Sequence, residues 1–191
     1  MDTAADQLLS TVKLARAEHH ERLRLRSYVT ALPKARVNFI VFFVDSEGKL
    51  SKEATSAAAQ RLARREGVSA VGDVLSNAFA SPRGFNAVVA GKGAADVVAM
   101  QLGDATDWLL LIRGTDERSA PSAIVSGLRT YSMRTTISLI DASNGSKLRE
   151  FGINDVTGAG VNETAAKAAF IERFSEMLAT RDELLTGLQR P

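Results

Sequence analysis

The chain has 191 residues, of which 45% are hydrophobic and 24% are charged, as is ordinary for one globular domain. A chain of this length folds without disulfides or metals, and the absence of cysteine excludes disulfides, thiolate zinc sites and a cysteine nucleophile. The formal net charge is only +2, whereas a domain that binds nucleic acid through its phosphates usually has a larger excess of basic residues. We therefore predict no nucleic-acid partner.

Residues 1–32 are predicted to form an amphipathic amino-terminal helix. Its apolar stripe, which includes Leu8, Leu9 and Val12, follows the spacing of three and four that is typical of one helix face. A helix of this length is marginal in water unless that face is packed, so we expect the stripe to bind a second copy or another partner, with docking on its own domain as the alternative. The basic residues of 1–36 most simply form a solvated face, and a membrane-surface contact is the alternative.

The start of the chain carries no recognisable targeting signal. No run of 18 apolar residues is present, so no membrane-spanning helix is expected. The first six residues are acidic and polar with no apolar stretch behind them, so no signal peptide is expected either. Two locations are compatible with this amino-terminal sequence. The protein is cytoplasmic, or the chain is the mature segment of an envelope protein.

In chain order, the apolar, β-branched and aromatic run 37–44 predicts a strand covered on both faces. Ser51 is placed to cap a helix that reaches Glu66, and Gly67 is expected to end that helix. A second helical stretch with Val71 on its apolar face is expected next. A short strand over 85–90, a helix that ends before Gly103 and a mostly buried strand over 107–114 are predicted to follow.

The carboxyl-terminal part carries the clearest β pattern. Segment 115–122 is polar and contains Pro121, so we expect an exposed, mobile loop. Apolar and polar residues then alternate over 131–139, Asn144 and Gly145 suit a hairpin turn, and the chain returns over 148–156. Asn162 is placed to cap a final helix that runs to about residue 188. These elements predict an α/β fold: a mixed sheet of about five strands with packed helices in one domain over 36–191, plus the amino-terminal helix.

No set of residues points to catalysis, to a cofactor or to a metal. His19 and His20 are adjacent, so on a helix they diverge by about 100° and do not converge on one ion. The turn that begins at Gly91 lacks phosphate-loop spacing because Asp96 stands where the third glycine would be. We predict a protein that is not an enzyme. The competing hypothesis is a cytosolic α/β enzyme or small-ligand-binding domain with a pocket near Gly91–Asp96.

Three stretches carry a family resemblance over about residues 70–180. The first is a helix that ends in Leu102-Gly103, followed by an Ala-x-Asp motif and a strand that ends in Gly114. The second is the strand and turn of 135–148, and the third is the helix and strand of 74–90. Together they resemble the bacterial envelope proteins typified by the curli-secretion lipoprotein CsgG, the penicillin-binding-protein activator LpoB and the amino-terminal domain of TolB. In that group the first motif lacks the extra Asp104, and the hairpin turn is Thr-Gly.

The resemblance implies a periplasmic or outer-membrane-associated protein that acts by assembly or partner recruitment, with no catalytic residues to carry over. We expect an oligomer whose partner is another envelope protein or another copy of the chain. Segment 115–122 and the hairpin 130–155 are expected to form the partner surface, with Arg113, Arg118 and Arg134 as contact residues.

Overall fold

The computed structural model describes residues 37–72 and 106–188. The predictions for the helix over 1–32 (Leu8, Leu9 and Val12 included), for the histidines, for the strand over 85–90 and for the pocket near Gly91–Asp96 lie outside the described residues.

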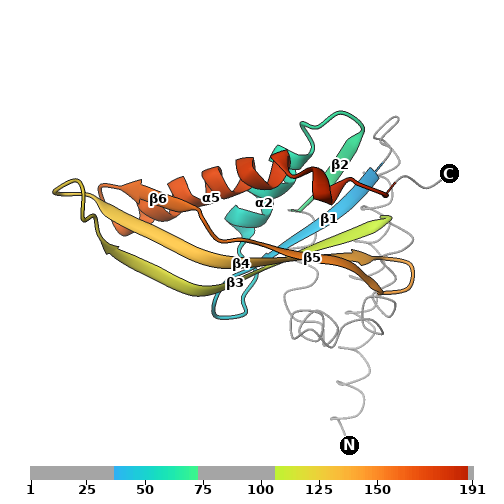
Figure 1. Cartoon of the computed structure of the whole chain (residues 1–191), viewed down its shortest axis with the longest axis horizontal. Helices are drawn as coiled ribbons and strands as arrows, with labels where there is room; N and C mark the ends of the chain where they lie inside the picture. Colours follow the sequence, from blue (N-terminus) through green and yellow to red (C-terminus); the bar gives the residue numbers. More distant parts are fainter. Residues whose placement is uncertain (1–36, 73–105, 189–191) are drawn as a thin grey trace, which may run out of the picture.

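The described residues form a six-stranded mixed sheet with two α-helices on one face (Figure 1). The strand order is β2-β1-β3-β4-β5, and β6 pairs with β4 beside β5. The strands are β1 (Val37–Val44), β2 (Val68–Val71), β3 (Trp108–Pro121), β4 (Arg129–Asp141), β5 (Lys147–Ile153) and β6 (Thr157–Gly160); the helices are α2 (Lys52–Leu62) and α5 (Glu163–Thr180). The predicted α/β class is confirmed.

Strand β1 lies inside the sheet, parallel to both β2 and β3. Phe39 and Phe43 join the core cluster under the helices, while Ile40 and Phe42 alternate onto the other face and are also fully buried. The prediction of a strand covered on both faces is therefore confirmed.

Helix α2 begins directly after Ser51, as the sequence predicts. The Ser51 hydroxyl caps the helix by accepting a hydrogen bond from the Ala54 amide. The helix ends at Leu62, four residues before the predicted end at Glu66, and Gly67 then adopts a positive φ of 74° that turns the chain back towards the sheet. The expected second helical stretch is wrong at its start, because Val71 lies in β2. There the edge of β1 offers backbone hydrogen bonds, so that Val68 pairs with Val37 and Val71 with Ile40.

The expected loop over 115–122 is also wrong, because β3 continues without a break to Pro121 and pairs with β4 almost to the turn. β1 ends at Val44, opposite Arg113. Beyond that point, in the described part of the chain, β3 pairs with β4 alone, and its residues Thr115 to Arg118 are exposed and polar. The polar composition therefore reflects exposure of a strand, and the connecting turn is confined to 122–128.

The remaining elements follow the predicted order. The turn at Asn144-Gly145 joins β4 to β5, with Gly145 at a φ of 73°. The Asn162 side chain accepts a hydrogen bond from the Ala165 amide, 2.8 Å away, and so caps α5 as predicted. The predicted end near residue 188 is wrong: the helix ends at Thr180, where Arg181 takes an extended backbone, and a short 3-10 turn at Asp182–Leu184 follows.

Helix α5 packs on the sheet through aromatic contacts and through glycine backbone. The Phe170 ring lies 5.3 Å from the Tyr131 ring, and the Phe174 ring lies 5.5 Å from the Phe43 ring, both edge to face. Strand β6 passes so close beneath α5 that a Cβ on Gly158 would lie 2.0 Å from the Ala166 carbonyl oxygen. Only glycine fits there, and this approach sets the position of the start of α5.

We expect Gly158→Ala to destabilise the domain by roughly 1–3 kcal/mol, because backbone atoms of α5 must move to admit the methyl group. Gly152→Ala on β5 is the matched control, since its nearest neighbours would lie at 3.2 Å. The free energy of unfolding in urea measures both variants. Equal stability of the two would contradict the close approach of β6 and α5.

Candidate functional site: the projecting arm

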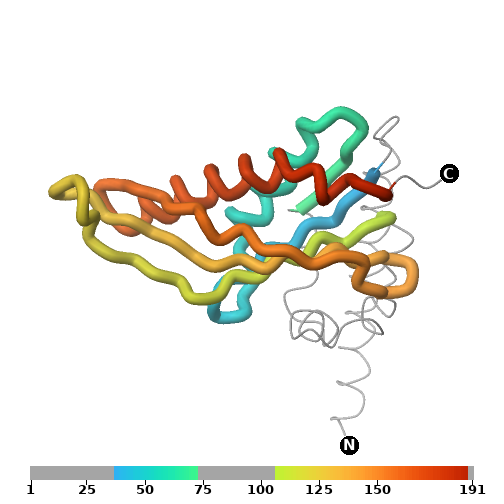
Figure 2. The backbone as a smooth tube through the Cα atoms, viewed as in Figure 1, coloured from blue at the N-terminus to red at the C-terminus, as the bar shows by residue number. Residues whose placement is uncertain are grey.

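The β3–β4 hairpin projects beyond the end of β1, and we call its residues 114–134 the arm. Figure 2 shows the arm as the yellow end of the tube, running out past the other strands. Among the described elements, β6 and the start of α5 run beside it, and β6 pairs with the outer part of β4, from Arg129 to Ser132. The arm is therefore a paired strand extension with two broad faces and a free end.

A β-bulge lies at the base of the arm. Thr115 pairs with Arg134 and Arg118 with Ser132, so that Asp116 and Glu117 together oppose the single residue Met133. Asp116 has a φ of 49°, in the left-handed region that aspartate adopts more readily than most side chains. The β3 strand thus gains one residue relative to β4.

The bulge decides which way Arg118 faces. In a regular strand, residues five apart lie on opposite faces, so Arg113 and Arg118 would be separated. The extra residue restores the alternation: Arg113 opposes Thr136, and Arg118 opposes Ser132 on the same face of β4. Arg134 lies between these partners on that face. All three predicted contact residues therefore lie on one surface, which we call the outer face because it is turned away from α2 and α5.

The three arginines differ in what holds them. Arg134 forms an ion pair with Asp116 at 3.2 Å, from one strand of the arm to the other. Arg113 is half-buried, and its charge assists Lys147 and Ser138 in lowering the pKa of Glu150 on the same face. Arg118 is exposed, and within residues 37–72 and 106–188 no carboxylate pairs with it.

Glu117 anchors the arm to the helix-bearing side of the molecule. Its carboxylate accepts a hydrogen bond from the Ser46 hydroxyl at 2.7 Å and lies 3.5 Å from the Lys167 ammonium on α5. The same ammonium lies 5.5 Å from the centre of the buried Tyr131 ring. The bulge residue thereby links three segments far apart in the sequence: the β1–α2 turn, the arm and α5.

The pKa values in this anchor follow from its contacts. Partial burial acts to raise the pKa of Glu117, but Ser46, the Tyr131 hydroxyl and Lys167 outweigh it, so the pKa lies below its ordinary value. Burial, and then the neighbouring Glu117 carboxylate, raise the pKa of Tyr131. Glu117 is therefore ionised and Tyr131 neutral at neutral pH.

The free end of the arm exposes apolar side chains. Ile124 is 94% exposed and Val125 48%, and we call these two residues the apolar tip. Val161, 74% exposed, follows the residue of β6 that pairs with Arg129, at the same end of the molecule (Figure 1). Leu148, 50% exposed, lies at the opposite end, next to the β4–β5 turn.

The turn that carries the apolar tip is internally hydrogen-bonded. The Ser122 hydroxyl accepts from the amides of Ile124 and Val125, and the Ser122 amide donates to the Leu128 carbonyl at 2.8 Å. Gly127 closes the turn with a φ of 82°. The two apolar side chains are thus presented by a defined backbone. Sequence reasoning missed them; the available signal was an Ile-Val pair between Ser122 and Ser126-Gly127.

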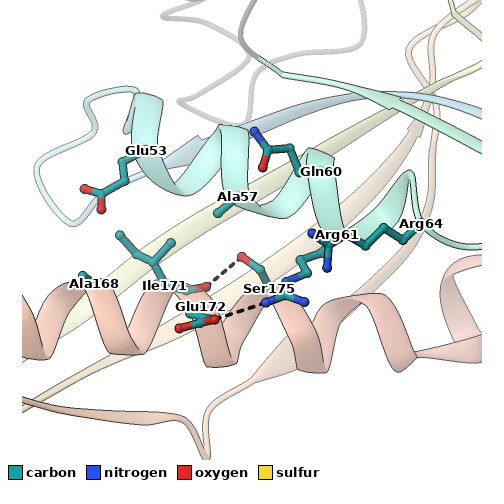
Figure 3. A pocket seen from close by; sticks show the side chains of 9 residues that line it. All are labelled: Glu53, Ala57, Gln60, Arg61, Arg64, Ala168, Ile171, Glu172 and Ser175. Carbon is teal, nitrogen blue, oxygen red and sulfur yellow. Dashed lines mark hydrogen bonds and ion pairs between the residues drawn. The ribbon is translucent and has the colours of Figure 1, made fainter.

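A groove of about 270 Å³ lies between α2 and α5 (Figure 3). Arg61 of α2 crosses it to Glu172 and Glu176 of α5, at 3.2 and 3.0 Å. The groove is smaller than the usual 300–1,000 Å³ of small-molecule sites. In the part of the chain that the structure describes, no three His, Asp or Glu side chains are grouped to hold a metal ion. Neither α2 nor α5 is long and apolar enough to cross a bilayer.

No family model and no curated protein matches the chain. Among solved structures it is similar to lipoprotein GNA1162 from Neisseria meningitidis, at a TM-score of 0.41 and 14% identity over 76% of this chain and 99% of that chain. It is also similar to the PelC dodecamer from Paraburkholderia phytofirmans (TM-score 0.42, 17% identity, 80% and 93% of the two chains). A third is protein XCC0632 from Xanthomonas campestris (0.37, 12%, 82% and 90%). Likenesses at these TM-scores assign neither function nor partner, and the resemblance to the curli-secretion group stays a prediction.

The anchor predicts a specific pH dependence. Because the pKa of Glu117 is lowered in the folded state, its contacts stabilise the fold above the ordinary value of 4.5 and are lost as the pH falls through the lowered pKa. Glu117→Gln should therefore lower the melting temperature at pH 7 and reduce the further loss below pH 4.5. Glu163→Gln, an exposed carboxylate at the same end, is the control. Parallel pH profiles for native chain and Glu117→Gln would contradict the anchor.

Proposed function

We propose that this domain is a non-enzymatic partner-binding or assembly module of a bacterial cell-envelope complex, and that the arm is its contact surface. The observation that carries the proposal is the apolar tip on a projecting, anchored pair of strands. An isolated exposed apolar side chain is ordinary on a protein surface. Here Ile124, Val125 and Val161 lie at one end of the molecule, on a turn and a corner with defined backbone geometry.

The outer face supplies the second part of the surface. Arginine is enriched in protein interfaces because its guanidinium combines charge with a flat apolar surface. Arg113, Arg118 and Arg134 share this face and are separated there by threonine and serine side chains. In our proposal the apolar tip supplies the buried centre of the contact, and the arginines supply its polar rim and orientation.

The envelope location in this proposal rests on the sequence resemblance described above, and periplasmic or outer-membrane-associated placement follows from it. The partner is another envelope protein or another copy of this chain, and an oligomer is expected. The amino-terminal stripe of Leu8, Leu9 and Val12 remains a second proposed contact, attached to one domain over 36–191.

The competing enzyme hypothesis gains no support from the described residues. Its pocket near Gly91–Asp96 lies outside them. The groove between α2 and α5 is lined mainly by charged and polar side chains, of which Arg61 is ion-paired with Glu172. The Ser175 hydroxyl there donates to the Ile171 carbonyl, at 2.7 Å, rather than to a base.

The arm proposal predicts that Ile124→Ser combined with Val125→Ser reduces recovery of partners in a pull-down from envelope extracts at least about tenfold, since loss of buried apolar contact at an interface centre costs more than 1 kcal/mol per residue. The melting temperature should stay unchanged because both side chains are exposed. Leu148→Ser, which is exposed to the same degree as Val125 and lies at the other end of the sheet, is the control and should recover partners normally.

Replacement of Arg113, Arg118 and Arg134 by alanine should weaken the same recovery with little change in thermal stability. Arg118 and Arg134 are exposed, and an exposed ion pair such as Arg134–Asp116 contributes little to folding. Undiminished recovery by both the tip variant and the arginine variant would overturn the placement of the contact surface on the arm.

A further inference from the structure

We infer that the arm is closed to strand addition along its free edge, so that a partner contacts its tip and its outer face instead. A strand edge without a neighbour is a ready template for a further strand, and strand addition is a common way in which proteins bind extended segments or further copies of themselves. The inference concerns how the arm is bound and holds whichever partner binds it.

The free edge is the side of β3 that β1 leaves uncovered. β1 lies beside β3 as far as the pair of Val44 and Arg113, and in the described part of the chain β3 pairs with β4 alone beyond that point. Over 118–121 the pairing with β4 is regular. The backbone groups of this stretch that point away from β4 therefore form the free edge.

The direction of each backbone group follows from the hydrogen bonds at the end of the arm. In an antiparallel pair, the N–H and C=O of one residue face the partner strand, and those of the next residue face away. The Ser122 amide donates to the Leu128 carbonyl at 2.8 Å, and the Ala120 carbonyl accepts from the Thr130 hydroxyl at 3.3 Å. Ser122 and Ala120 therefore face β4, and the residue that precedes each of them faces the free edge.

Pro121 removes a donor from the free edge. The two residues of 118–121 that face this edge are Ser119 and Pro121, and proline has no N–H. Ser119 thus carries the one backbone donor of this stretch of edge, beside two carbonyls. An added strand needs a donor and an acceptor at every second residue, and sheets use proline on edge strands to deny it one.

The base of the arm is closed by other means. The bulge at Asp116 and Glu117 interrupts the regular spacing that a straight added strand would need. The Glu117 carboxylate also accepts a hydrogen bond at 2.7 Å from Ser46, which lies in the turn directly after β1 and so on this side of β3. An added strand would therefore meet the bulge and the turn at one end and Pro121 at the other.

Restoring the missing donor tests the role of Pro121. Pro121→Val adds an N–H at the free edge, where it bonds a strand of a second copy, and two such bonds per pair of copies should make self-association, measured by sedimentation, about tenfold tighter or more. Ala120→Val is the matched control, because it adds the same side chain at the neighbouring exposed position, whose backbone faces β4. Self-association of Pro121→Val no tighter than that of Ala120→Val would overturn the inference.

Amide hydrogen exchange in the native chain tests the edge directly. The Ser119 amide should exchange fast and the Ala120 amide slowly, in dilute and in concentrated solution alike. Protection of the Ser119 amide at high concentration would reveal an added strand and overturn the inference. If Ser119 stays unprotected while the tip variant keeps all its envelope partners, the closed edge stands and the proposed function fails. If Ser119 is protected while the tip variant loses its partners, the closed edge fails and the proposed function stands.

Discussion

The β-bulge at Asp116 and Glu117 is the constraint on which the arm depends. A strand that leaves the sheet would normally keep its alternation, and every side chain beyond the bulge would then lie on the other face. The additional residue turns Glu117 towards Ser46 and Lys167 and sets Arg118 outward with Arg113 and Arg134. The bulge requires a positive φ at Asp116, which is unfavourable for a residue other than glycine. The Asp116 carboxylate forms an ion pair with Arg134. The anchor and the outer face therefore follow from one irregularity in pairing.

The core and the arm are joined through α5. Phe170 and Phe174 stack on each other and contact Tyr131 of the arm and Phe43 of the central strand. Lys167, one turn earlier, reaches the Glu117 carboxylate. Glycine in β6 lets the helix begin close to the sheet. The same helix thus forms part of the core and holds the arm in place.

Local signals predicted much of this fold, and nonlocal pairing accounts for the rest. The apolar run of β1, the caps Ser51 and Asn162 and the Asn144-Gly145 turn each act within a few residues, and all lie where the sequence predicts. Residues 68–71 form a strand because β1 offers an edge, which no local pattern records. Residues 115–121 were mistaken for a loop because the bulge interrupts the alternation and exposure makes the strand polar. The three predicted contact residues lie on one face, although strand periodicity alone would have separated two of them, and their role as partner contacts stays a prediction.

The register of the arm is the most direct test of the account, and nuclear Overhauser effects between backbone protons of β3 and β4 measure it. The bulge predicts cross-strand contacts between Arg118 and Ser132 and between Ser119 and Tyr131. A regular strand continued from Thr115 and Arg134 would instead place Glu117 opposite Ser132 and Arg118 opposite Tyr131. Observation of the second set would remove Arg118 from the outer face and Glu117 from its anchor, and would contradict the account.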